Sequence, residues 1–154
     1  MHDTNTVHTM RKLLFAIAAF PAILSACNGG SGASADQLRE EAIAIHDEIM
    51  PQVSSFDRNT VKIDSLLANL PELKAANPDL DTAQTRIELT ALKGRLEEAT
   101  DAMMEWMMAF EVDPQEKSAD ETKAYYEGEV EKVKRMKQLF EEVSKESAEK
   151  LAPF

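Results

Sequence analysis

Residues 38–70 read LREEAIAIHDEIMPQVSSFDRNTVKIDSLLANL, and the spacing of the apolar residues in this stretch decides the fold class. These residues recur at alternating steps of three and four, at Leu38, Ala42, Ile45, Ile49, Val53, Phe56, Thr60, Ile63, Leu67 and Leu70. Steps of this size place the side chains along one face of an α-helix. The stretch therefore predicts one long amphipathic helix that packs through a narrow apolar seam.

The same spacing occurs twice more along the chain. One set is Leu89, Leu92, Leu96, Ala99, Met103, Trp106 and Phe110, and the other is Tyr126, Val130, Val133, Met136, Phe140, Val143 and Leu151. The pattern of a capping box begins each predicted helix, at 34–37, 81–84 and 118–121. Two prolines mark 71–78 as a connector, and Asp113-Pro114 ends the second helix. Because short connectors join antiparallel neighbours, residues 36–154 are predicted to form an all-α, antiparallel three-helix bundle with helices at about 36–70, 80–111 and 118–151.

Composition agrees with one small helical domain and excludes several functions. The 154 residues include only five glycines and six prolines, which argues against a turn-rich sandwich or barrel. The formal net charge of −11 argues against a nucleic-acid partner, because binding to phosphates needs a basic surface. A single cysteine excludes an internal disulfide and a cysteine-based zinc site.

The N-terminal residues have the pattern of a targeting segment. Arg11 and Lys12 precede an almost wholly apolar run at 13–26, which is too short for a comfortable membrane-spanning helix. The run ends Leu24-Ser25-Ala26-Cys27, which resembles the lipobox of bacterial lipoproteins. The resemblance implies that residues 1–26 are a cleaved signal peptide and that Cys27 becomes an acylated N-terminus. The alternative is an ordinary secreted protein. Translation is expected to start at Met1 or at Met10, and both starts stay open.

The residues after Cys27 bear on where such a lipoprotein would be held. Residues 27–35 are rich in glycine and serine and predict a flexible tether from the lipid to the bundle. Asn28 is not the aspartate that suggests inner-membrane retention in some bacteria, and the tether has no early acidic cluster. We therefore expect a lipid bilayer as the partner of Cys27, and the periplasmic face of the outer membrane rather than the inner membrane.

A methionine-rich segment near the end of the second predicted helix is the most unusual feature of the bundle. Residues 102–110 read AMMEWMMAF and contain four of the eight methionines in the chain. Met104 and Met108 are expected to point away from the apolar seam, towards solvent. Folding the helices into antiparallel pairs is expected to bring His46, Met50, Trp106, Tyr125 and Tyr126 to the same height as these methionines.

Three interpretations of this cluster remain open. The first interpretation is a pliable methionine-rich layer of the core, since methionine fills irregular gaps well. Alternatively, it is a partner-binding surface formed by Met104, Met108 and Phe110. The third interpretation is a soft-metal site for Cu(I), because imidazole and thioether groups suit that ion. The residues that would form this metal site are His46, Met50, Met103, Met104 and Met107.

Two motifs in the predicted bundle resemble a known group of proteins. His46-Asp-Glu-Ile-Met-Pro51 and Ala102-Met-Met-Glu-Trp-Met107, with the lipobox ahead of both, resemble small helical Bacteroidota lipoproteins of unassigned function, some labelled "viral A-type inclusion protein". The resemblance implies a lipoprotein and a helical bundle, with no activity. An enzyme is not expected, because removal of residues 1–26 leaves one histidine and no acid–base–nucleophile set.

Overall fold

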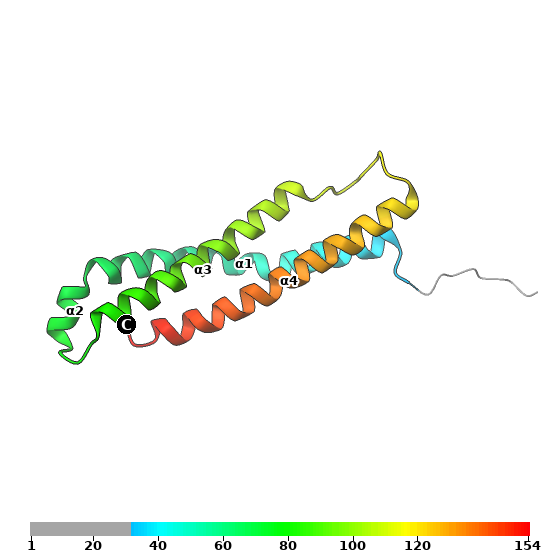
Figure 1. Cartoon of the computed structure of the whole chain (residues 1–154). Helices are drawn as coiled ribbons and strands as arrows, with labels where there is room; N and C mark the ends of the chain where they lie inside the picture. The colour runs from blue at the N-terminus through cyan, green and yellow to red at the C-terminus, as the bar shows by residue number, and fades with distance from the viewer. Residues whose placement is uncertain (1–31) are drawn as a thin grey trace, which may run out of the picture. The chain divides into compact units, whose positions relative to one another are not determined.

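A computed structural model of the chain describes residues 32–154, which form a single compact unit of four helices. They are α1 (Ala35–Ala68), α2 (Leu70–Ala76), α3 (Thr82–Ala109) and α4 (Ala119–Leu151) (Figure 1). The predicted all-α bundle is therefore confirmed for this part of the chain. The predicted signal peptide, Cys27 and most of the predicted tether lie outside the described residues. Among the four helices, none combines the length and apolar character needed to cross a bilayer.

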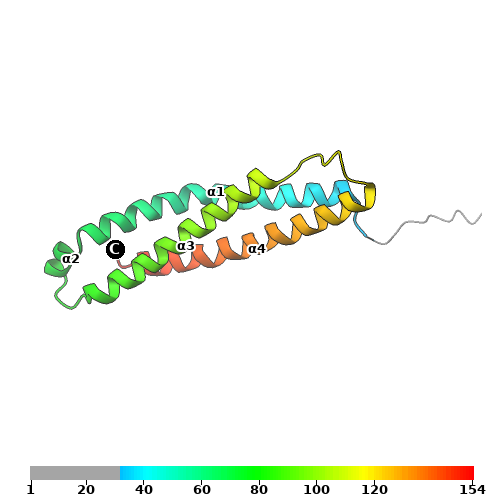
Figure 2. The ribbon, with the colours of Figure 1, turned by 45° about the horizontal axis from the view of Figure 1, so that its top comes forward.

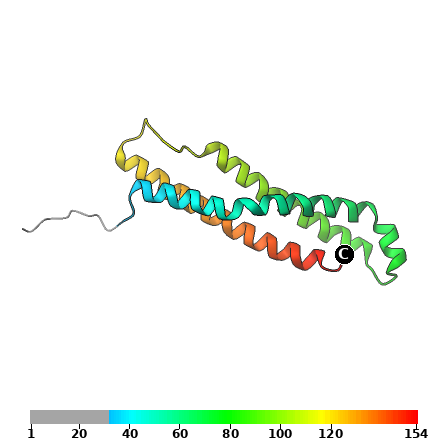
Figure 3. The same cartoon turned by 180° about the vertical axis from the view of Figure 1, so that it is seen from behind.

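The three long helices lie side by side; α3 runs antiparallel to α1 and α4, which run parallel to each other (Figures 1 and 2), and α4 packs most extensively on α1. The starts of α1 and α4 lie at one end of the bundle, whereas α3 ends short of it and the connector to α4 covers the remaining length (Figure 2). The short α2 and the C-terminus lie at the other end (Figure 3). Towards its C-terminal end α3 separates from α4 (Figures 1 and 3). The methionine-rich segment therefore lies in the half of the bundle in which α1 begins, alongside the part of α1 that contains His46.

The predicted seams form the core. Every predicted seam residue of α4 is buried, and α3 buries all of its predicted positions except the half-buried Phe110. In α1 the fully buried positions repeat every seven residues from Ala42 to Ile63, and Leu70 at the start of α2 continues the repeat. The intervening seam positions of α1 lie half-buried at the edge of the core. Midway along the bundle, Phe56 stacks on Phe140 with ring centroids 4.8 Å apart. The heptad spacing therefore determines which face of each helix leaves water.

The capping patterns locate the helix starts. Ser34 with Gln37, and Ser118 with Glu121, form complete capping boxes in which each side chain bonds the backbone of the other residue. Asp81 accepts hydrogen bonds from the amides of residues 83 and 84, both at 3.0 Å. The side chain of Gln84 bonds Glu88 instead of returning to Asp81, so the second predicted capping box is only half present.

Two predicted boundaries were wrong. The segment predicted as a connector contains α2, because a proline costs nothing in the first helical turn and Pro71 lies there. Glu72, Leu73 and Lys74 are good helix formers, and the helix ends before Asn77-Pro78. The second long helix is shorter than the predicted 80–111, since Asp81 is its N-cap and Phe110 leaves the helical conformation.

Candidate functional site

Aromatic side chains from three helices gather where the methionine-rich segment meets α1 and α4. The ring centroids of His46 and Trp106 are 5.5 Å apart in a stacked arrangement, and those of Trp106 and Phe110 are 4.7 Å apart. Phe110 also lies within 6.5 Å of Tyr125 and 6.1 Å of Tyr126. The expected convergence of these residues at one height is confirmed. Bulky rings fill the space where α3 separates from α4.

A buried carboxylate underlies this aromatic cluster. Glu129 on α4 is only 4% exposed, and its Oε2 accepts a hydrogen bond of 2.9 Å from Nε1 of Trp106. Its other oxygen accepts a bond of 2.7 Å from the ammonium of Lys132, which reaches in from the surface. Because an unpaired buried charge is costly, these two donors account for the presence of a glutamate in the core. Sequence periodicity did not identify Glu129, since its acidic side chain lies one position before the seam residue Val130.

His46 is the one histidine of the described residues and is largely buried on α1. Its Nδ1 lies 2.9 Å from Oδ1 of Asp47, whereas Nε2 is buried and has no hydrogen-bond partner within residues 32–154. A neutral ring that donates its proton from Nδ1 to Asp47 leaves a lone pair on Nε2. The ring that contains this nitrogen stacks on Trp106.

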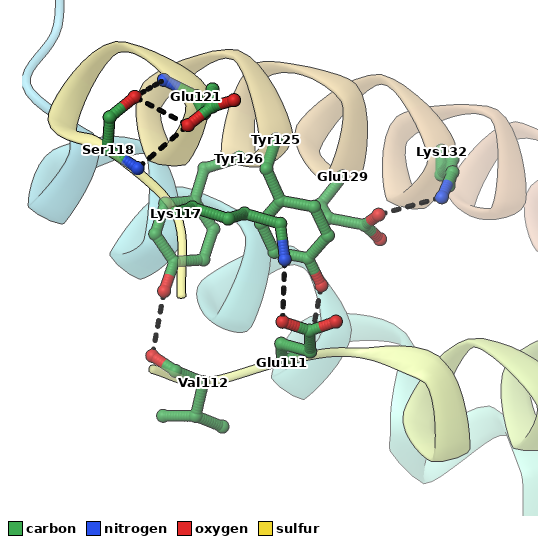
Figure 4. Close-up of polar contacts among 9 residues, drawn as sticks. All are labelled: Glu111, Val112, Lys117, Ser118, Glu121, Tyr125, Tyr126, Glu129 and Lys132. Carbon is green, nitrogen blue, oxygen red and sulfur yellow. Dashed lines mark hydrogen bonds and ion pairs between the residues drawn. The ribbon is translucent and has the colours of Figure 1, made fainter. Parts of the chain in front are cut away.

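The connector between α3 and α4 is tied to the first turns of α4 (Figure 4). The hydroxyl of Tyr125 accepts a bond of 2.7 Å from the amide of Glu111, and the hydroxyl of Tyr126 donates one of 2.7 Å to the carbonyl of Val112. Lys117 pairs with the Glu111 carboxylate at 2.8 Å and lies over the Tyr125 ring. These contacts hold the end of α3 in a defined position.

Two ionisable groups of this connector are shifted by their contacts. Burial raises the pKa of Tyr125 above its ordinary value, and the hydrogen bond from the Glu111 amide opposes that shift only in part. The hydrogen bond to Glu111 raises the pKa of Lys117. At neutral pH Tyr125 is therefore an uncharged phenol and Lys117 a cation, which are the forms that the contacts in Figure 4 require.

Three methionines of α3 face solvent. Met104 is 45% exposed, Met107 41% and Met108 78%, and Val112 in the connector is also exposed. The predicted outward orientation of Met104 and Met108 is confirmed. Phe110, the third residue of the predicted partner surface, packs inward against Trp106. We use the name methionine surface for Met104, Met107, Met108 and Val112.

The residues of the predicted metal site lie in two environments. Met103 is fully buried, and Met50 is half-buried against the same core near His46. Met104 and Met107 are exposed instead. Within residues 32–154, no group of three or more histidine, cysteine or carboxylate residues is arranged to hold a metal ion. A Cu(I) site formed by all five predicted residues stays a prediction.

Comparisons of the chain with protein-family models, with curated proteins and with solved structures find no match.

Proposed function

We propose that the protein is a non-catalytic, lipid-anchored bacterial lipoprotein whose bundle presents the methionine surface to a protein partner. One observation carries the proposal. Met104, Met107, Met108 and Val112 expose apolar side chains within nine residues, although the core beneath them is already complete. Exposing apolar side chains costs free energy, at about 25 cal/mol per Å². A contiguous apolar patch on a soluble surface is typical of an interaction site.

The chemistry of the methionine surface suits a partner with an apolar centre and a basic rim. Methionine side chains are unbranched and polarisable, so they adapt to the shape of an apolar partner. Asp101 and Glu105 lie within one helical turn of Met104 and form no ion pair within the described residues. An arriving surface with lysine or arginine at its edge would be attracted to these carboxylates. We therefore favour a protein partner over an anionic membrane surface.

Anchoring rests on the sequence around Cys27 and agrees with where the bundle begins. Ser34, the N-cap of α1, follows Cys27 by only seven positions, which span at most about 25 Å. An acylated Cys27 would thus hold the end of the bundle at which α1 starts, and with it the half that contains the methionine surface, towards the bilayer. The partner would accordingly be a membrane protein or a protein held at the same membrane, and we propose the outer membrane, facing the periplasm.

Replacing Cys27 tests the anchor. Mass spectrometry of the N-terminal peptide from native protein should find a cleaved, acylated Cys27, and the protein should partition into the detergent phase. The Cys27→Ser variant should lose acylation and retain the uncleaved segment. A native chain with an unmodified Cys27 thiol would overturn the lipoprotein assignment, whatever the role of the bundle.

The partner surface is tested by introducing charge on it. In the Met104→Glu/Met108→Glu variant, the partner found by photo-crosslinking from position 107 should be lost, while helicity and the melting temperature should be retained. The matched control is Val61→Glu/Ile87→Glu, because those apolar side chains are 70% and 64% exposed elsewhere on the bundle. Equal crosslinking in both variants, or unfolding of the first, would contradict a docking role for the methionine surface.

A further inference from the structure

The three exposed methionines of α3 form a compact set of sulfur donors. Met107 and Met108 follow Met104 by three and four residues in α3, which places the Cβ atom of each about 5–6 Å from that of Met104. Met107 and Met108 themselves are adjacent in sequence and diverge by about 100°, one on either side of Met104. The other methionines of the described residues belong to the core: Met103 and Met136 are buried, and Met50 packs against the core cluster. Met104, Met107 and Met108 lie outside that cluster and expose much of their side chains.

We propose that Met104, Met107 and Met108 together bind one soft monovalent metal ion, Cu(I) or its analogue Ag(I). Thioether sulfur is a soft, neutral donor that selects Cu(I) over hard cations such as Mg²⁺ and Ca²⁺. A thioether needs no deprotonation, so binding by this set releases no proton, unlike binding by thiols. Each methionine side chain has three rotatable bonds, and the exposed ends are free to turn towards a shared ion.

The surroundings of the three sulfur atoms favour a cation. Asp101 and Glu105 flank Met104 on the same helix, and Glu111 follows Met108 by three residues. All three carboxylates are exposed, and only Glu111 is paired with a lysine within the described residues. Thioethers are uncharged and cannot neutralise a bound cation. The negative charge of these carboxylates attracts a monovalent cation to the three sulfur atoms. These carboxylates are hard oxygen groups, and the soft donors determine the choice of metal.

This set differs from the metal site predicted by sequence. The unpartnered Nε2 of His46 is buried against Trp106, so it belongs to the interior, whereas Met104, Met107 and Met108 open to solvent. Two methionines are common to both sets, Met104 and Met107. Met108 takes the place of His46, Met50 and Met103. An exposed site can load and release its ion without opening the core.

The test is a titration of the full chain, purified in detergent, with Cu(I) under nitrogen against a chromophoric Cu(I) chelator. Every variant keeps Cys27, which has no free thiol when acylated as proposed above, because Cys27→Ser would retain residues 1–26 and with them the donors His2, His8, Met1 and Met10. We expect uptake of one Cu(I) per chain. Replacing a residue that only hydrogen-bonds to a metal ligand costs about 10–100-fold in metal affinity. Losing a ligand itself should cost at least as much, so Met104→Leu, Met107→Leu and Met108→Leu should each weaken binding by at least about tenfold. The triple variant should bind none at the site.

The matched control is Met136→Leu, which removes a thioether from the core and should leave the affinity unchanged. A second readout uses chains with ¹³C-labelled methionine methyl groups. Ag(I) should shift the resonances of Met104, Met107 and Met108 and leave Met103 and Met136 in place. Absence of uptake, or uptake that survives in the triple variant, would overturn the proposal. The leucine variants keep the surface apolar, whereas the glutamate variants do not. Leucine variants that no longer bind the metal but still crosslink to the partner would therefore separate this proposal from the docking role.

Discussion

The hydrogen bond between Trp106 and the buried Glu129 should contribute a measurable part of the stability of the bundle. In the Glu129→Leu variant, Nε1 of Trp106 loses its acceptor at a position where both side chains are buried, 8% and 4% exposed. An unsatisfied buried donor costs about 1–3 kcal/mol. Lys132 also loses its partner, but its side chain is exposed enough to regain water, so its share of the loss is small.

The magnitude converts into a shift of the melting temperature. For a folded body of this size, each kcal/mol corresponds to about 4 °C, so the expected decrease is about 4–12 °C. Trp106→Phe removes the same hydrogen bond from the donor side, and the double variant Trp106→Phe/Glu129→Leu leaves no orphaned donor. The double variant should therefore be more stable than the sum of the single losses predicts, by about 1–2 kcal/mol.

The assay is unfolding in urea followed by far-ultraviolet circular dichroism, because the tryptophan signal is absent from two of the variants. Glu129→Gln is the control, since its amide oxygen can still accept from Trp106. Strict additivity in the double variant would refute the reasoning, and so would a loss below about 0.5 kcal/mol in Glu129→Leu, which is the range of ordinary surface substitutions. Either result would mean that the indole N–H finds water in this end of the bundle.

Three further predictions concern the ends and the middle of the bundle. Ser118→Ala should cost about 1 kcal/mol by removing the N-cap of α4. A hydrogen bond from the Ser118 side chain lowers the pKa of Glu121 below its ordinary value of 4.5, so this carboxylate contributes stability above pH 4.5 that is lost as the pH falls through the lowered value. The melting temperatures at pH 7 and pH 3 should therefore differ less in Ser118→Ala than in the unchanged chain. An unchanged difference would contradict the assignment. Tyr126→Phe should lower the free energy of unfolding by about 1 kcal/mol and speed amide exchange over 111–117, because Tyr126 donates a hydrogen bond to the Val112 carbonyl. Tyr125→Phe is the comparison, since the Tyr125 hydroxyl accepts a hydrogen bond from the Glu111 amide. Unaltered exchange in Tyr126→Phe would show that other contacts hold the connector. Phe56→Ala should cost about 3–5 kcal/mol in urea unfolding, since its ring is buried on Phe140, and a loss near that of the exposed Val61→Ala would place it outside the core.

Much of the fold follows from local pattern. Apolar residues three and four apart determine which face of each helix is buried, and serine with glutamine or glutamate three residues later locates two helix starts. The pattern failed at α2, where a proline read as a breaker lies at a position that a helix tolerates. It also failed at Glu129, because a charged residue is assigned to the surface unless its partner is known, and its partner Trp106 lies 23 residues away in the sequence.

By itself the sequence determined that α1, α3 and α4 would form, which of their faces would be buried, and that Met104 and Met108 would point outward, because helix periodicity depends only on near neighbours. It also contains the residues from which a lipid anchor at Cys27 is proposed. The tertiary structure alone decided that Phe110 turns into the core and that Glu129 is buried beside Trp106. It also decided that Nε2 of His46 has no hydrogen-bond partner within residues 32–154. These outcomes depend on how far apart the helices pass and on which side chains meet between them. Spacing along a single helix contains no information about either.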